Sequence, residues 1–364
     1  MTETLLRVEN LVTTFSTAEG KLSAVRGVSF SVRKGETLCI VGESGCGKSI
    51  TSLSIMGLLP SNGAVESGSI EFAGRDLTKL SKEELRRIRG NEMSMIFQEP
   101  MTALNPVFTI GYQLREPLML HQKLSKQEAH ERGIELLKQV GIPFPEKRMK
   151  QYPHELSGGM RQRVMIAMAL ACHPSLLIAD EPTTALDVTI QAQILDLMNE
   201  LKQKLNMAVI LITHDMGVVA EMADRVMVMY AGEKVEEGDV ESIFANPRHP
   251  YTKGLLQSVP SVDDEEYSLE PIPGTLPSLN EQIDGCRFHP RCPFATDQCR
   301  TAPPPERTIR ASHSVRCWLE EGSTTMSESK QPLLKLESVK SITRSGRTVA
   351  ARPRLRKSGR ERFP

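Results

Sequence analysis

Short apolar runs alternate with segments of helical spacing through most of the chain. Runs bounded by glycine or polar residues, as buried strands are, lie at Thr37–Val41, Met93–Phe97, Leu176–Ala179 and Ala208–Ile212. A looser alternation predicts strands at residues 5–12 and 28–32, and helical spacing predicts helices at 49–59, 81–90, 125–140, 160–172 and 189–205. Strands that alternate with helices in this way predict an α/β fold with a mainly parallel core sheet.

The pattern changes near residue 247, where proline and glycine become frequent and the periodicity is lost. We therefore expect a main domain over residues 1–246 and an irregular extension over residues 247–322. Residues 323–364 form a third segment that is basic and poor in apolar residues, and we expect it to be disordered.

Charge is unevenly spread along the chain. It has 45 basic and 45 acidic residues, but nine of the basic residues and only one acid lie between Lys340 and Pro364. The preceding residues therefore hold 36 basic and 44 acidic side chains, a net charge of −8. Because phosphate neutralisation needs a basic surface, this acidic body disfavours nucleic acid as a partner.

The sequence also lacks the marks of a membrane-spanning or secreted chain. The longest apolar run, Val164–Cys172, is too short to cross a bilayer, and no charged-then-apolar segment follows Met1. We expect a location inside the cell, with any membrane role supplied by partner subunits.

A glycine-rich loop follows the first buried strand. Residues Gly42-Glu-Ser-Gly-Cys-Gly-Lys48-Ser49 fit the G-x-x-x-x-G-K-S pattern, between a predicted strand and a predicted helix. Glycines let backbone N–H groups turn toward phosphate oxygens, and the helix that follows directs its positive end at the same anion. We expect Lys48 to reach the β- and γ-phosphates and the Ser49 hydroxyl to bind Mg²⁺.

Polar side chains end three of the other apolar runs. Asp180 and Glu181 follow Leu176–Ala179, and we predict that Asp180 holds Mg²⁺ while Glu181 polarises the attacking water as general base. His214 follows the next run, at the carboxyl edge where open α/β sheets bind ligands, and could hydrogen-bond the γ-phosphate. Gln98 follows Met93–Phe97 and offers an amide oxygen suited to the metal.

A second anion-binding segment lies more than a hundred residues after the first. In Leu156-Ser-Gly-Gly-Met160, the residues Ser157, Gly158 and Gly159 open an Ala-rich helix without a lysine of their own. Two such segments in one chain suggest that two chains share each nucleotide.

With this segment the sequence resembles an ABC-type ATPase, the motor subunit of ABC transporters, from about Leu5 to Val259. The resemblance implies a P-loop NTPase fold in which a mainly parallel core sheet is joined by an antiparallel β subdomain and a helical signature subdomain at about 100–170. It implies catalytic roles for Glu181, His214 and Lys48, and Mg²⁺ binding by Ser49, Gln98 and Asp180. The nucleotide-binding residues that it implies are Phe15, Gly42, Glu43, Ser44, Gly45, Cys46, Gly47, Lys48, Ser49, Ile50, Gln98, Leu156, Ser157, Gly158, Gly159, Asp187 and His214.

The resemblance also implies how two chains cooperate. Two ATPase domains pack head to tail, either as a homodimer or as a heterodimer. Each ATP lies between the phosphate loop of one chain (Gly42–Ser49) and the signature segment of the other (Leu156–Met160). Nucleotide binding then favours the closed dimer, and hydrolysis opens it.

Four of the seven cysteines lie close together in the extension, as Cys286-x5-Cys292-x6-Cys299-x17-Cys317. Under the reducing conditions of the cytosol, such a group indicates a metal site before it indicates disulfides. Four thiolates can hold a [4Fe–4S] cluster or a tetrahedral zinc ion, and the wide spacing favours iron–sulfur over zinc.

The extension resembles that of oligopeptide and dipeptide importer ATPases, on residues 246–256, Pro260 and 285–293, and on the Gln98–Pro106 segment. This implies an importer with a second ATPase, two membrane permease subunits and an extracellular binding protein, with this chain on the cytoplasmic face of the membrane. The four cysteines match the positions of an iron–sulfur cluster in this subgroup. Nickel and glutathione importers belong to the same subgroup and remain open alternatives, as does a soluble ABC ATPase.

The end of the chain repeats its beginning. Pro332-Leu-Leu-Lys-Leu-Glu-Ser-Val339 is similar to Thr4-Leu-Leu-Arg-Val-Glu-Asn-Leu11, and the likeness is lost after about Ala350. We interpret the tail as a frameshifted start of a second ATPase domain; a genuine basic tail that contacts anionic lipid or nucleic acid is the alternative.

Overall fold

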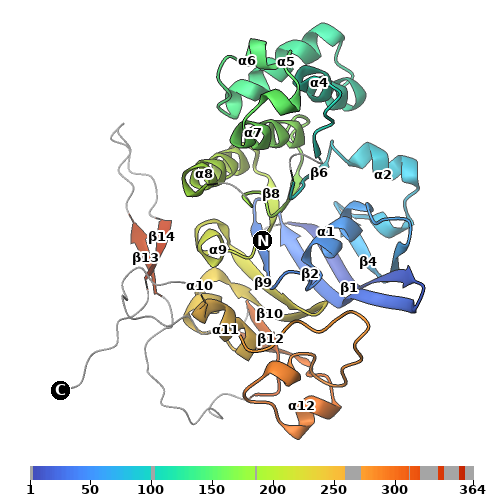
Figure 1. Ribbon diagram of the computed structural model, residues 1–364, viewed down its shortest axis with the longest axis vertical. Coiled ribbons are helices and arrows are strands. Elements are labelled where there is room, and N and C mark those ends of the chain that lie inside the picture. Colours follow the sequence, from blue (N-terminus) through green and yellow to red (C-terminus); the bar gives the residue numbers. More distant parts are fainter. Residues whose placement is uncertain are drawn as a thin grey trace, which may run out of the picture. The chain divides into compact units, whose positions relative to one another are not determined.

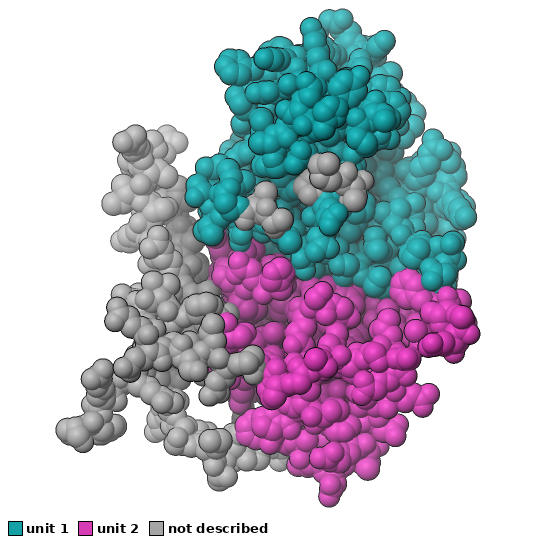
Figure 2. All heavy atoms as spheres, viewed as in Figure 1, with its two compact units in different colours: residues 1–11, 29–37, 49–212 teal, residues 12–28, 38–48, 213–364 magenta. Residues whose placement is uncertain are grey.

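The computed structural model describes residues 3–99, 103–184, 187–258, 272–310 and 312–319, and the backbone of residues 335–339 and 352–356. The chain forms two compact units, each built from separate stretches of sequence (Figure 2). Unit 1 contains residues 1–11, 29–37 and 49–212, and unit 2 contains residues 12–28, 38–48 and 213–364.

Unit 1 contains three parallel strands in the order β8-β7-β6, namely β6 (Met93–Ile96), β7 (Leu176–Asp180) and β8 (Ala208–Ile212). Every residue of the three strands is buried, as expected when both faces of a parallel sheet are covered. The three apolar runs of the sequence therefore predicted these strands within a residue of their ends.

The helices of unit 1 include the three that pack against one another, α4, α5 and α7 (Figure 1). Ser81 and Ser125 begin α2 and α5 with capping boxes, which explains why both helices start where their sequences predict. The sequence did not predict α4, whose apolar stripe is interrupted by Pro117. The helices are α1 (Lys48–Met56, whose first residue is in unit 2), α2 (Lys82–Ile88), α4 (Ile110–His121), α5 (Lys126–Gln139), α6 (Pro145–Arg148), α7 (Gly158–Ala169) and α8 (Val188–Leu205), with 3-10 turns η1 (Leu77–Lys79) and η2 (Pro153–Glu155).

A second sheet has the order β2-β1-β4-β5. Its strands are β1 (Thr4–Thr17), β2 (Gly20–Arg33), β4 (Gly63–Phe72) and β5 (Arg75–Asp76), and β1 and β2 contribute residues to both units. In unit 1, Gly68 has φ +95° and a Cβ there would lie 2.6 Å from the Asn10 carbonyl oxygen, so only glycine fits. Both β1 and β2 are longer than predicted, because the added stretches, residues 13–17 and 20–27, carry no regular apolar alternation.

Unit 2 contains five strands in the order β11-β12-β10-β9-β3. The strand β3 pairs in parallel with β9, and the other pairs are antiparallel. These strands are β3 (Thr37–Val41, whose first residue is in unit 1), β9 (Arg225–Tyr230), β10 (Glu233–Asp239), β11 (Glu306–Arg310) and β12 (His313–Arg316). The helices of this unit are α9 (Met216–Met222), α10 (Val240–Ala245), α11 (Pro250–Gln257) and α12 (Asp297–Thr301), with the 3-10 turn η3 (His289–Arg291).

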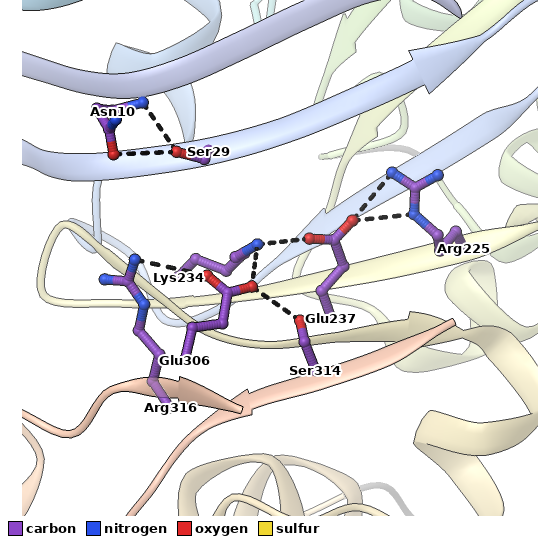
Figure 3. A network of polar contacts seen from close by, with 8 residues as sticks. All are labelled: Asn10, Ser29, Arg225, Lys234, Glu237, Glu306, Ser314 and Arg316. Atoms are coloured by element: carbon purple, nitrogen blue, oxygen red, sulfur yellow. Dashed lines mark hydrogen bonds and ion pairs between the residues drawn. The ribbon is translucent and has the colours of Figure 1, made fainter. Parts of the chain in front are cut away.

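The extension is thus more regular than its sequence predicts, because β12 adds to the edge of β10 at Glu236–Val315 and Glu237–Ser314. A network of charged side chains holds this edge in place (Figure 3). The buried Lys234 ammonium lies 2.8 Å from both Glu237 and Glu306, and Arg225 lies 2.9 Å from Glu237.

Figure 3 also shows a contact within unit 1, between β1 and β2. The Asn10 N–H donates to the Ser29 hydroxyl at 2.8 Å.

The predicted tail, residues 323–364, lies outside the described residues except for two short strands. The strand β13 (Lys335–Val339) pairs antiparallel with β14 (Arg352–Arg356). Disorder of the tail and its origin in a frameshift stay predictions.

None of the helices in the described part of the chain has both the length and the apolar character of a membrane span.

Candidate nucleotide site

The phosphate loop of unit 2 is built around glycines that no other residue could replace. Gly42 has φ +151°, and a Cβ there would lie 2.3 Å from the Met229 carbonyl oxygen. Gly47 has φ +105°, and its Cβ would lie 2.7 Å from the Ala24 carbonyl oxygen. The loop backbone is therefore packed closely against its neighbours, as a loop that uses its N–H groups as ligands requires.

The lysine of the motif lies inside this loop. Lys48 is only 5% exposed, and its Nζ donates hydrogen bonds to the carbonyl oxygens of Gly42 at 2.7 Å and Glu43 at 3.0 Å. Ser44 and Gly45 are exposed at the outer turn of the loop, whereas Cys46 is buried. Burial raises the pKa of the Cys46 thiol, which keeps it neutral beside the ammonium group. The ammonium group of Lys48 is thus held by backbone carbonyl oxygens of the loop.

In unit 1, two of the three residues predicted to bind Mg²⁺, Ser49 and Asp180, contact each other. The Ser49 hydroxyl donates to a carboxylate oxygen of Asp180 at 3.0 Å, and Asp180 is 5% exposed at the end of β7. A hydroxyl and a carboxylate side by side are the oxygen ligands that Mg²⁺ prefers. The residues present therefore fit the metal.

The predicted general base is held by two donors. Glu181 Oε2 accepts a hydrogen bond from Gln98 Nε2 at 2.9 Å and another from the Thr184 hydroxyl at 3.0 Å. Glu181 has a left-handed backbone with φ +46°, a conformation that is strained in residues other than glycine and is found at functional sites. The structure thus brings Gln98 to the carboxylate of Glu181.

The signature segment forms an exposed helix start. Ser157 is the N-cap of α7 and accepts from the Met160 N–H at 3.4 Å, and Ser157 and Gly158 are both exposed. A Cβ at Gly159 would lie 3.1 Å from a side-chain carbon of Ile190 on α8, and Leu156 is buried. The first N–H groups of α7 therefore face outward, where an anion can reach them.

The remaining predicted residues occupy separate positions. Phe15 is half-buried on β1, Ile50 is half-buried on α1, and His214 is exposed two residues after the end of β8. Asp187 is the N-cap of α8 and accepts from the Ile190 N–H at 3.0 Å. A role for Asp187 in starting the helix was not foreseen.

The four cysteines of the extension lie near one another, but the structure does not confirm the metal site predicted for them. No group of three or more His, Cys, Asp or Glu side chains in the described ranges is arranged to hold a metal ion. Burial, with smaller contributions from the thiols of Cys317, Cys299 and Cys292, raises the pKa of Cys286 to about 12. The four thiols are the soft sulfur donors that iron–sulfur clusters and zinc use.

Two residues that the sequence did not single out contact the phosphate loop. Arg291 forms a two-pronged ion pair with Glu43, with N–O distances of 2.6 Å and 2.9 Å. The Glu43 N–H donates to the Tyr251 hydroxyl at 2.8 Å. No local signal could have found these contacts, because they join residues more than two hundred positions apart in sequence.

The comparisons with known proteins agree with this geometry. Residues 25–184 match the ABC transporter family, and residues 235–299 match the C-terminal region of oligopeptide/dipeptide transporters. The chain is 56% identical over 323 residues to the oligopeptide transport ATP-binding protein AppD of Bacillus subtilis, covering 88% of this chain and 98% of that relative. The chain belongs to the ABC transporter ATP-binding family.

Other members of this family are similarly close. The dipeptide transport ATP-binding protein DppD of Bacillus subtilis is 57% identical, over 88% of this chain and 96% of DppD. The oligopeptide transport ATP-binding protein OppD of Escherichia coli is 55% identical, over 84% of this chain and 90% of OppD. The ABC resemblance predicted from the motifs is therefore confirmed, together with ATP hydrolysis as the activity.

Solved structures agree with the fold. A dimeric ATP-binding cassette in a post-hydrolysis state, bound to ADP and Pi, has a TM-score of 0.59 and 29% sequence identity, over 65% of this chain and 98% of that one. The predicted α/β fold of the ABC ATPase type, with mixed sheets, is confirmed. A metal-binding role of the extension is not.

Proposed function

We propose that this chain is the ATP-hydrolysing motor subunit of an ABC importer that takes up dipeptides or oligopeptides. The observation that carries the proposal is the Glu181 carboxylate, which two hydrogen bonds orient. Glu181 is the next residue after Asp180, which contacts Ser49 in unit 1. A lysine inside a glycine loop and an oriented carboxylate are the parts that phosphoryl transfer needs. The names of the close relatives support peptides as the cargo.

Each group has a distinct task in this proposal. Lys48 and the loop N–H groups bind the β- and γ-phosphates, and Phe15 stacks on the adenine. Ser49, Asp180 and Gln98 hold Mg²⁺, which neutralises phosphate charge when bound. Glu181 accepts the proton of the attacking water, and His214 donates to the γ-phosphate.

A second ATPase subunit completes each site. We propose that Ser157 and Gly158 of one chain bind the γ-phosphate held by the loop of its partner, head to tail. The exposed N-terminus of α7 supports this, as does the solved cassette, which is a dimer with ADP and Pi. Two permease subunits would anchor the dimer at the cytoplasmic face of the membrane and receive peptide from an extracellular binding protein.

Affinity purification from detergent-solubilised membranes tests this proposal. We expect two permease subunits and a second ATPase to co-purify, and peptide to stimulate ATP hydrolysis once the binding protein is added to the reconstituted complex. Recovery of the chain without membrane subunits would contradict the transporter role. Stimulation of ATP hydrolysis by nickel or glutathione, with none by peptide, would support the role as an importer ATPase but contradict peptide as the transported substrate.

We also propose that Cys286, Cys292, Cys299 and Cys317 together hold a [4Fe–4S] cluster of structural role. The proximity of the four thiols supports this, because Cys317, Cys299 and Cys292 all influence the pKa of Cys286. Cys299 and Cys317 are buried, and Cys286 and Cys292 are half-buried. Anaerobically purified protein should contain about four iron atoms and four labile sulfides per chain and absorb near about 400 nm. Colourless protein with stoichiometric zinc would contradict the cluster.

A further inference from the structure

We infer that the extension positions the phosphate loop, and that Arg291 and Tyr251 are the residues through which it does so. The inference rests on the proposed function in one respect, namely that the loop binds the phosphates of ATP. In this assignment the side chain of Glu43 is the attachment point of the loop to the extension, and it does not bind nucleotide.

The ion pair between Arg291 and Glu43 fixes the relative orientation of the two side chains. Both terminal nitrogens of the Arg291 guanidinium contact the Glu43 carboxylate, a pairing that fixes orientation as well as distance. The Arg291 side chain is 5% exposed and that of Glu43 is 30% exposed, so the pair is partly shielded from water. The carboxylate beside it raises the pKa of the Arg291 guanidinium, which therefore stays charged.

The arginine itself is held firmly by the extension. Its Nε donates to the Pro273 carbonyl oxygen at 2.8 Å, and Nη2 also donates to the Ile272 carbonyl oxygen at 3.3 Å. The guanidinium carbon lies 5.7 Å from the centre of the Tyr230 ring, within range of a cation–π interaction. Because three neighbours hold the guanidinium in place, little side-chain freedom is lost when it binds Glu43.

Tyr251 holds the backbone of the same residue. Its hydroxyl accepts the Glu43 N–H, and its fully buried ring packs against Tyr230 and Phe288, with ring centres 4.8 Å and 5.5 Å apart. Two anchors on one residue fix both the direction of its side chain and the plane of its peptide group.

The anchored residue contacts the lysine of the loop. The carbonyl oxygen of Glu43 accepts a hydrogen bond from Lys48 Nζ at 3.0 Å. A loop that is already in place loses less entropy when it binds phosphate, so its anchors should increase the affinity for nucleotide. They should change the maximal hydrolysis rate less, because the general base Glu181 belongs to another part of the chain.

Equilibrium binding of MgATP to the full-length chain, measured by calorimetry, tests the inference. We expect Arg291→Gln and Glu43→Gln each to weaken binding about tenfold, and the double variant to weaken it about tenfold as well. Arg291→Lys should recover only part of the affinity, because an ammonium group cannot make the two-pronged contact. In steady-state hydrolysis, KM should rise while kcat stays within about threefold.

A matched control exists in unit 1, where Arg75 pairs with Glu92 in the same two-pronged manner. The variant Arg75→Gln should leave the affinity for MgATP unchanged. The inference would be overturned if folded Arg291→Gln bound MgATP as tightly as the wild-type chain. It would also be overturned if the double variant bound MgATP about a hundredfold more weakly, since the two single effects would then be independent.

Hydrogen exchange without nucleotide separates this inference from the proposed function. Arg291→Gln and Tyr251→Phe should speed exchange in peptides that cover residues 42–48, and Arg75→Gln should not. If the wild-type chain binds no ATP but shows this pattern, the anchoring stands and the proposed function fails. If the wild-type chain binds ATP but exchange in the loop is the same in all variants, the anchoring inference is contradicted and the proposed function stands.

Discussion

At the scale of single residues, the proposed chemistry depends on carboxylates that neighbouring donors keep in one orientation. Glu181 receives hydrogen bonds from Gln98 and Thr184, while Asp180 receives one from Ser49. A carboxylate that accepts two hydrogen bonds loses rotational freedom and points where its donors allow. We therefore propose Glu181 as the general base and Asp180 as a metal ligand.

The first prediction concerns Glu181→Gln. The amide keeps the size of the side chain but cannot accept a proton from water, so ATP should still bind while turnover falls by about 10²–10⁴-fold. Binding is measured with a fluorescent ATP analogue and turnover by phosphate release. Phosphate release at the wild-type rate would refute the role of Glu181 as general base.

The second prediction concerns pH and His249, a fully buried residue of unit 2 whose Nδ1 accepts the Tyr251 N–H at 3.1 Å. Burial lowers its pKa from 6.5 to about 4, against a smaller opposite effect of Glu236. The folded state therefore takes up this proton less readily than the unfolded state. Its contribution to stability is complete above about pH 6.5 and is lost as pH falls toward about 4.

Denaturation in urea at pH 7.5 and pH 4.5 measures this effect. Between pH 7.5 and pH 4.5, the free energy of unfolding should fall by about 2–3 kcal/mol more in the wild-type chain than in His249→Asn. The asparagine keeps a hydrogen-bond acceptor but does not titrate. Equal losses in both proteins would assign the acid sensitivity to other groups.

At the scale of elements, helix starts have two uses in this chain. Ser125 begins α5 and Ser157 begins α7, each as an N-cap, but only α7 starts with a serine and two glycines. In α5 the capping box satisfies the helix with its own residues, since the Glu128 carboxylate accepts the Ser125 N–H at 2.8 Å. In α7 no such carboxylate follows the cap, which leaves that end suited to an external anion.

The third prediction compares Ser157→Ala with Ser125→Ala. Each loses one N-cap, so each should lower the free energy of unfolding by about 1 kcal/mol. Only Ser157→Ala should also lower the ATPase rate of the assembled dimer, by about tenfold or more, because it removes a hydrogen bond to a charged phosphate. An equal ATPase rate in the two variants would contradict the signature role of Ser157.

At the scale of the whole molecule, the proposal requires two chains for each nucleotide. One chain supplies the loop with Lys48, and its partner supplies the start of α7. Binding of ATP should then shift the equilibrium toward the dimer, since only the closed pair makes both sets of contacts.

The fourth prediction is that Glu181→Gln, with the second ATPase present if one is required, forms a stable dimer only when ATP is added. Analytical ultracentrifugation should show the ATP-dependent increase in mass, and addition of Lys48→Ala to the same chain should abolish it. A monomer at saturating ATP, with nucleotide demonstrably bound, would refute the shared site.

Local sequence is enough to predict strands that are buried on both faces. The runs at Leu176–Ala179 and Ala208–Ile212 predicted buried strands correctly, because a strand covered on both faces needs only apolar residues and a polar end. The hairpin β11–β12 was missed, because short, half-exposed strands with charged residues carry no clear alternation. The helix α4 was missed because Pro117 interrupts its pattern.

The sequence by itself determined which residues are proposed to carry the chemistry, because the loop from Gly42 to Ser49 and the acids at the end of β7 are contiguous segments that residue type and spacing identify. Only the tertiary structure decided what holds these segments in place. The left-handed backbone of Glu181, the pairing of β10 with β12 and the contact of Arg291 with Glu43 all depend on residues distant in sequence. Such contacts form when packing brings separate stretches together, and no local pattern encodes which partner will be there.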